Sequence, residues 1–202
     1  MKKTCALFFV FLSASCMAQP LSLPQQTALH FTLPPRLHEG VTDCIWLRIE
    51  DHWHSGRYDS IFPLFFLLTR LDPGDTEAWA TGGWFLINAV SWNLPSPDRE
   101  RIVAKALSFI REGLEHNRQT YELYWELAWI HYRRGAYRQA MDYITGAEKF
   151  PHPAFVDTTK AHILMKQGKR QAAIRQWEYI RDNRPEMSNV ARRFLKEFEN
   201  GA

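Results

Sequence analysis

The chain has 202 residues, of which 46% are hydrophobic and 23% are charged. This length and composition exclude a disordered chain and a membrane protein with many spans, and they allow one domain with a core of its own. The formal net charge of +3, from 25 Lys and Arg against 22 Asp and Glu, is too small to indicate a nucleic-acid-binding protein.

The N-terminal residues are arranged like a bacterial export signal. Lys2 and Lys3 precede an apolar stretch over residues 5–11, which is followed by small residues. Because this stretch is too short to cross a bilayer of about 30 Å as a helix, it favours a signal peptide over a membrane anchor. We therefore predict a signal peptide over residues 1–18, cleavage after Ala18, and export of the mature chain to the periplasm or cell envelope.

A lipoprotein is the alternative. Residues 12–16 resemble the lipoprotein box, in which the cysteine becomes the lipidated first residue, although Ser13 stands where that box prefers Leu. Lipidation at Cys16 would make the protein an outer-membrane lipoprotein, and this is the only contact with a membrane that we expect. Cleavage after Ala18 leaves Cys44 as the single thiol, and we expect Cys44 to be a small buried residue.

Residues 19–41 form a lead-in that we expect to be extended. Prolines at positions 20, 24, 34 and 35 interrupt helix formation, and no period of 2 or 3.6 persists between them. Either this segment lies across the folded body through Leu29, Phe31 and Leu33, or it is a loose tether.

From residue 42 onward a helical pattern repeats. Gly56, Gly135 and Gly168 each precede a stretch with apolar residues at helical spacing that ends near a proline. The last two glycines are 33 residues apart, whereas the first two are 79 apart, which is one unit of 34 plus a longer unit of 45. The surplus of the longer unit falls near residues 88–98, where prolines and polar residues indicate a loop.

The longer unit opens with Trp79, Gly82 and Gly83 and continues with Ala106 and Gly113 at the spacing of the other units. Together these residues resemble the tetratricopeptide repeat (TPR), whose pattern is W-x2-L-G-x2-Y, then A-x3-F, then P. Small residues in this pattern let the two helices of a pair approach closely, and larger apolar residues fill the space between them. The resemblance implies an all-α fold, a right-handed α-solenoid of antiparallel helix pairs.

The resemblance covers residues 42–187 and divides them into four units. They lie at about 42–75, 76–120 with the insertion near 88–98, 121–153 and 154–187, and the first matches the pattern least well. Residues 188–202 follow as a predicted capping helix, because their apolar side chains fall on one helical face and their charged side chains mostly on the other.

In proteins with this repeat, the first helix of each pair lines the concave surface. The resemblance therefore implies a groove rich in aromatic residues. Five of the eight Trp fall in it, whereas Trp79 and Trp177 take core positions and Trp92 lies in the insertion. The register also places His162 and Met165 of the last unit in this groove. The predicted partner-binding residues are Trp46, Trp53, Trp84, Trp125, Trp129, Tyr132 and Arg133.

Two interpretations of this groove stay open. Trp and Tyr bury a large area at little cost in side-chain entropy, which favours binding of a partner protein or peptide. Alternatively the rings pack against each other or against residues 19–41, since aromatic stripes at helical spacing are often core.

Catalytic and metal-binding patterns are absent from the sequence. His52 and His54 are two residues apart, so their rings diverge on a helix and do not chelate one ion. Asp72 and Asp75 flank a Pro-Gly turn, and Asp75 fits the cap of the next helix. We expect no enzyme activity, no catalytic residue, no cofactor and no metal.

These observations together predict an exported TPR scaffold or adaptor that binds a protein or peptide through the aromatic groove, and no nucleic acid. A structural subunit of an envelope assembly with a self-filled groove is one alternative. A glycan-binding module is the other, because Trp rings beside carboxylates also suit sugars.

Overall fold

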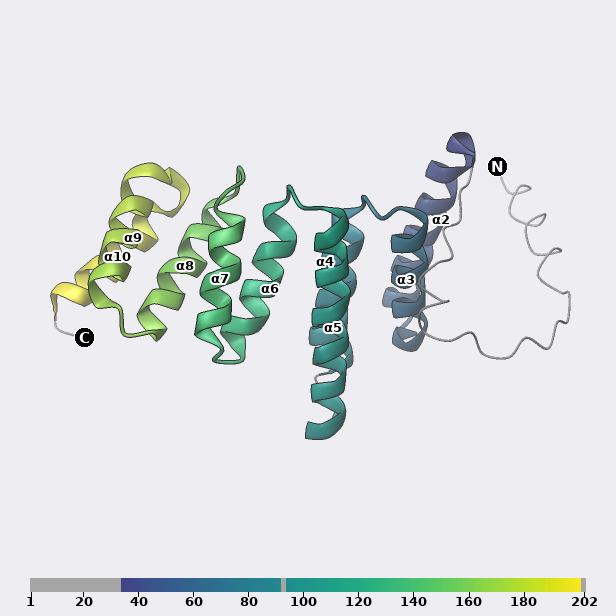
Figure 1. The fold of residues 1–202 in the computed structure, drawn as a ribbon, viewed down its shortest axis with the longest axis horizontal. Helices are drawn as coiled ribbons and strands as arrows, with labels where there is room; N and C mark the ends of the chain where they lie inside the picture. Colours follow the sequence, from purple (N-terminus) through teal and green to yellow (C-terminus); the bar gives the residue numbers. More distant parts are fainter. Residues whose placement is uncertain (1–33, 92–93, 201–202) are drawn as a thin grey trace, which may run out of the picture. The chain divides into compact units, whose positions relative to one another are not determined.

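The computed structural model describes residues 34–91 and 94–200, so the signal peptide, Cys16, Trp92 and residues 19–33 lie outside the described residues. Within these two ranges the chain forms nine α-helices and no strand. They are α2 (Pro35–His54), α3 (Ile61–Leu71), α4 (Thr76–Phe85), α5 (Ser96–His116), α6 (Tyr121–Arg133), α7 (Tyr137–Ala147), α8 (Ala154–Lys166), α9 (Arg170–Asn183) and α10 (Ser188–Glu199). In Figure 1 they follow one another in chain order, α2 packing with α3, α4 with α5, α6 with α7 and α8 with α9. The expected all-α array of helix pairs is confirmed.

The repeated glycines end the first helix of three pairs. Gly56, Gly135 and Gly168 follow α2, α6 and α8 with φ of +73°, +75° and +69°, in the left-handed region that favours glycine. The N–H of the residue after Gly56 donates to His52 O at 2.9 Å, and the glycine's own N–H donates to Trp53 O at 3.2 Å. The same two bonds recur after α6 and α8. The spacing seen in the sequence therefore marks one recurring helix end, the Schellman motif.

The second pair ends its first helix differently. α4 continues into a π-helical turn, Leu86–Val90, and α5 then begins at Ser96. The predicted loop near residues 88–98 is therefore shorter than expected at both ends. Pro97 is tolerated in the first turn of α5, where backbone N–H groups have no helical partner. The surplus residues mostly lengthen helices, and α5, with 21 residues, extends past its neighbours at one end in Figure 1.

α2 also begins earlier than predicted. Its first residue is Pro35, so residues 35–41 of the lead-in are helical rather than extended. A proline fits the first helical position, because its missing N–H has no helical role there. Contact with the next helix then holds this turn, since His38 Nε2 lies 3.0 Å from Leu71 O at the end of α3.

The core lies between paired helices and is built around buried aromatic residues. Trp79 and Trp177 are fully buried, as their places in the repeat predict. α4 and α5 approach so closely that a Cβ at Gly83 would lie 2.4 Å from Ile110 Cγ1, and one at Gly113 would lie 2.5 Å from Trp79 Cγ. The small residues in the pattern are thus required by helix packing.

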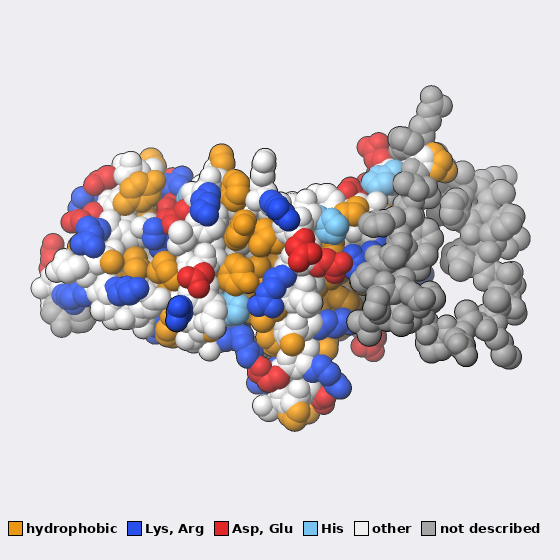
Figure 2. All heavy atoms as spheres, in the orientation of Figure 1, with side chains coloured by type: hydrophobic (Ala, Val, Ile, Leu, Met, Phe, Trp, Pro, Cys, Tyr) orange, Lys and Arg blue, Asp and Glu red, His pale blue; other side chains and the backbone are white. Residues whose placement is uncertain are grey.

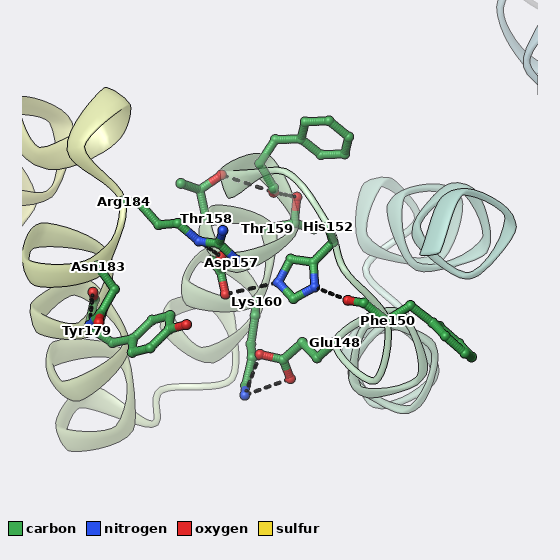
Figure 3. A network of polar contacts seen from close by, with 11 residues as sticks. Glu148, Phe150, His152, Asp157, Thr158, Thr159, Lys160, Tyr179, Asn183 and Arg184 are labelled. Carbon is green, nitrogen blue, oxygen red and sulfur yellow. Dashed lines mark hydrogen bonds and ion pairs between the residues drawn. The ribbon is translucent and has the colours of Figure 1, made fainter. Parts of the chain in front are cut away.

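A buried ionic network joins α8 to the end of α9 (Figure 3). The Asp157 side chain is only 2% exposed and accepts a hydrogen bond from Arg184 Nε at 2.7 Å. His152 Nε2 lies 3.4 Å from the other Asp157 oxygen, and His152 Nδ1 lies 2.6 Å from Phe150 O. The carboxylate also lies in the first turn of α8, where the helix dipole favours negative charge.

The outer surface carries charges of both signs. On the face shown in Figure 2, Lys and Arg side chains are interspersed with Asp and Glu along the helices. None of the described helices is both long enough and apolar enough to cross a membrane.

Candidate functional site

Three adjoining hollows run along the first helices of the pairs, and together we call them the groove. The apolar hollow, about 440 Å³, lies among α2, α3 and α4; the middle hollow, about 360 Å³, lies among α4, α5 and α6. The acidic hollow, about 310 Å³, lies among α4, α6 and α8. Trp84 lines the first two and Glu126 lines the last two, so neighbouring hollows share a lining residue.

The apolar hollow presents the most exposed tryptophans of the groove. Trp53 and Trp84 are 39% and 42% exposed, and their ring centroids are 6.1 Å apart. Trp46 also lines this hollow but is held in the fold, with its Nε1 donating to Asp75 Oδ2 at 3.2 Å and its ring edge-on to Phe65. Two of the three predicted residues here therefore offer free surface, and the third supports them.

The middle hollow combines aromatic walls with three arginines that have partners. Trp84 and Trp129 line it together with Ile87 and Val103. Its arginines are bonded within the chain: Arg133 donates to Asn88 Oδ1 at 2.9 Å, Arg134 makes two bonds to Glu100, and Arg99 donates to Leu94 O at 3.1 Å. The Arg134 pair raises the pKa of the guanidinium and lowers that of the carboxyl through the hydrogen bond between them.

Stacked rings join α6 to its neighbour. Trp125 and Trp129 stack with centroids 6.0 Å apart, and Trp129 stacks on Tyr132 at 5.5 Å. Trp125 also packs edge-on against Phe155 of α8 at 4.7 Å, and its Nε1 donates to Thr159 Oγ1 at 3.0 Å. These three predicted residues lie together, but much of their surface is used within the fold.

The acidic hollow contains a carboxyl group that sequence reasoning missed. Glu126 has no hydrogen bond or ion pair to any described residue, and burial raises its pKa to about 7. The signal was present in the sequence: Glu126 stands four residues after Glu122 and three before Trp129, on the helix face already assigned to the groove.

The helical array resembles solved structures at low sequence identity. No protein-family model matches the chain, and no curated protein matches it. Among solved structures, a thermophilic TPR protein of Thermus thermophilus is similar with a TM-score of 0.47 and 14% identity over 77% of this chain and 97% of that one. PilF of Pseudomonas aeruginosa is similar with a TM-score of 0.55 and 14% identity over 82% of this chain and 78% of that one. The chain has the TPR fold.

Two groove predictions for the last unit of this TPR fold are wrong. The His162 ring packs edge-on against Trp177 and Phe194, with centroids 5.2 and 5.1 Å away, and these two rings stack on each other. Met165 joins the same cluster, because Trp177 Nε1 contacts its sulfur at 3.4 Å. The capping helix α10 brings Phe194 to this cluster, so these two side chains serve packing.

The environments of two further residues in this TPR fold follow from the packing of α2. Cys44 is exposed, which contradicts the prediction of a buried thiol, because α2 turns Ile45 and Ile49 toward the core. His52 is buried and accepts a hydrogen bond from Arg57 Nε at 2.8 Å on its Nδ1. Within the described ranges, no group of three His, Cys, Asp or Glu residues is placed to hold a metal ion.

Proposed function

We propose that the protein is an exported scaffold that holds a segment of a partner protein in the groove. The observation that carries this proposal is the row of three adjoining hollows, with Trp53 and Trp84 exposed in the apolar one. Exposed tryptophans in a groove are typical anchors of protein interfaces, since they bury much apolar area when a partner covers them. The TPR fold supports the same function, and the signal-like residues 1–18 support export.

Exposed apolar surface in the groove favours binding of a partner over packing of the groove residues against one another. The rings of Trp125, Trp129 and Tyr132 stack on one another and form a wall of the groove, as the self-packing interpretation expects. Leu47, by contrast, is 65% exposed beside Trp53 in the apolar hollow. Among the described residues nothing covers this apolar surface, and a bound segment would bury it.

The test is capture of a partner from envelope extract with the full chain and two variants. Trp53→Ala with Trp84→Ala removes the exposed anchors but leaves the bonded rings of Trp46 and Trp125 in place. Tyr179→Ala removes a ring that is 46% exposed on α9, outside the groove, and is the matched control. We expect one protein to be captured by the wild type and by Tyr179→Ala and to be lost with the double variant.

Other results would contradict the proposal. Equal capture by all three proteins would place the contact outside the groove, and no captured protein would favour the structural subunit. A Trp fluorescence change with cell-wall glycan fragments, lost in the double variant, would favour the glycan-binding module.

Export is tested separately by fractionation and N-terminal sequencing. We expect the mature chain in the periplasmic fraction with Gln19 as its first residue. A membrane fraction that loses the protein on Cys16→Ala would instead show the lipoprotein, and retention in the cytoplasm would contradict export.

A further inference from the structure

The charged residues that line the acidic hollow are all negative, and they lie next to aromatic rings. Its seven lining residues include three glutamates and no Lys or Arg. The three glutamates come from two helices, and the rings of Tyr121, Trp125 and Phe155 form much of the remaining wall. Every arginine of the middle hollow, in contrast, is bonded to an oxygen of this chain.

Two of the three glutamates are explained by the fold. Glu77 and Glu122 lie in the first turns of α4 and α6, where the helix dipole stabilises a negative charge. Glu122 also accepts a hydrogen bond from Thr120 Oγ1 at 3.1 Å. Their positions therefore need no ligand.

Glu126 is not explained in this way. It lies one turn further along α6, beyond the first turn, and makes no hydrogen bond or ion pair with the described residues. A half-buried carboxyl group without a partner is destabilising when it is ionised, and its raised pKa reflects that cost. Because Glu126 lines both the middle and the acidic hollow, its carboxylate can meet a cationic group that enters either one.

The surroundings indicate the chemistry of that cation. Phe155, 39% exposed, and the half-buried Trp125 offer ring surfaces that attract an ammonium or guanidinium group and pack against its alkyl stem. A metal ion is disfavoured, since no three His, Cys, Asp or Glu residues in the described ranges are arranged to ligate one.

We propose that the acidic hollow is the subsite for a Lys or Arg side chain of the bound segment, with Glu126 as its carboxylate partner and Trp125 and Phe155 as its apolar walls. This inference rests on the proposed function, because the basic side chain belongs to a segment that lies in the groove. It adds that the partner carries a basic residue at one fixed position.

The charged groups around Glu126 set the pH dependence of this subsite. They come from α4, α5, α6 and the residue that follows α6, whereas α8 contributes only the uncharged Phe155 to the hollow. Since Lys and Arg stay charged below pH 9, binding should follow ionisation of Glu126 and tighten by up to about thirtyfold between pH 5.5 and pH 8. The charged residues that line the two hollows together with Glu126 are Glu77, Arg99, Glu122, Arg133 and Arg134.

The experiment is selection of random peptides displayed on phage against the immobilised full chain. We expect enriched peptides to share a Lys or Arg at one position, and this enrichment to disappear with Glu126→Gln. Glu197→Gln removes the same charge from an exposed site on α10 and should select the same peptides as the wild type. One selected peptide should bind Glu126→Gln about tenfold or more weakly at pH 8 and should lose most of its pH dependence with that variant.

The possible failures are distinguishable. Enriched peptides that depend on Trp53 and Trp84 but lack a common basic residue, or bind Glu126→Gln unchanged, would overturn this subsite and leave the proposed function standing. Absence of any enriched peptide would count against both. If Glu126→Gln does not fold, the pH dependence of wild-type binding decides, and equal affinity at pH 5.5 and pH 8 overturns the subsite.

Discussion

Replacing Gly113 by Ala is expected to lower the stability of the fold, although Ala is the better helix former. Gly113 lies inside α5, where the substitution would by itself gain about 1 kcal/mol. The added Cβ would stand 2.5 Å from Trp79 Cγ and 2.7 Å from Cδ2, well inside any normal contact distance. One of the two helices must therefore move.

The Trp79 ring has little freedom to give way. It is fully buried, its centroid is 4.6 Å from that of Phe109, and its Nε1 donates to Pro73 O at 3.0 Å. Overpacking against a fixed ring costs about 3 kcal/mol, at the upper end of the usual range. The helix propensity offsets about 1 kcal/mol of this, so the net loss is about 2 kcal/mol, or roughly 4–8 °C in Tm for a domain of this size.

Thermal and urea unfolding followed by circular dichroism measure this loss. The matched control is Gly40→Ala in α2, where a Cβ meets nothing within 4 Å, and which should stabilise by about 0.5–1 kcal/mol. A Gly113→Ala variant as stable as the wild type would refute the argument that this glycine exists for close helix packing.

Three further changes are expected to alter stability, each measured by the same unfolding curves. Folding raises the pKa of Glu126 from 4.5 to about 7, so the cost of burying its charge is absent below pH 4.5 and complete above pH 7. The Glu126→Gln variant should therefore match the wild type at pH 4 and be more stable by about 3 kcal/mol at pH 8. Equal stabilisation at both pH values would contradict the pKa shift. Asp157→Asn should cost about 3 kcal/mol of stability, because it leaves Arg184 without its buried partner. Asp182→Asn breaks an exposed pair with Arg181 and should leave Tm unchanged. Similar Tm values for the two variants would refute the expected contrast between the buried and the exposed pair. Gly135→Ala should cost about 1–2 kcal/mol because its φ of +75° strains any residue with a Cβ, and a gain like that at Gly40 would contradict this.

The sequence by itself determined where α2, α6 and α8 end and which residues lie at the centre of the core. Gly56, Gly135 and Gly168 act locally, because a left-handed residue ends a helix through bonds to the preceding turn. The burial of Trp79 and Trp177 follows from their places in the repeat pattern. The aromatic face of α6 was likewise readable, because residues three and four apart on a helix share a face.

Tertiary structure decided what those faces touch. Glu126 has an ordinary sequence context, and only the packing of α4, α5, α6 and α8 withdraws its carboxyl group from water. His162 and Met165 share the groove register with the other units, yet they pack against side chains of α9 and α10. A periodic pattern specifies which side of a helix a residue occupies; the exposure, pKa and free surface of that residue depend on which other helices are brought against that side.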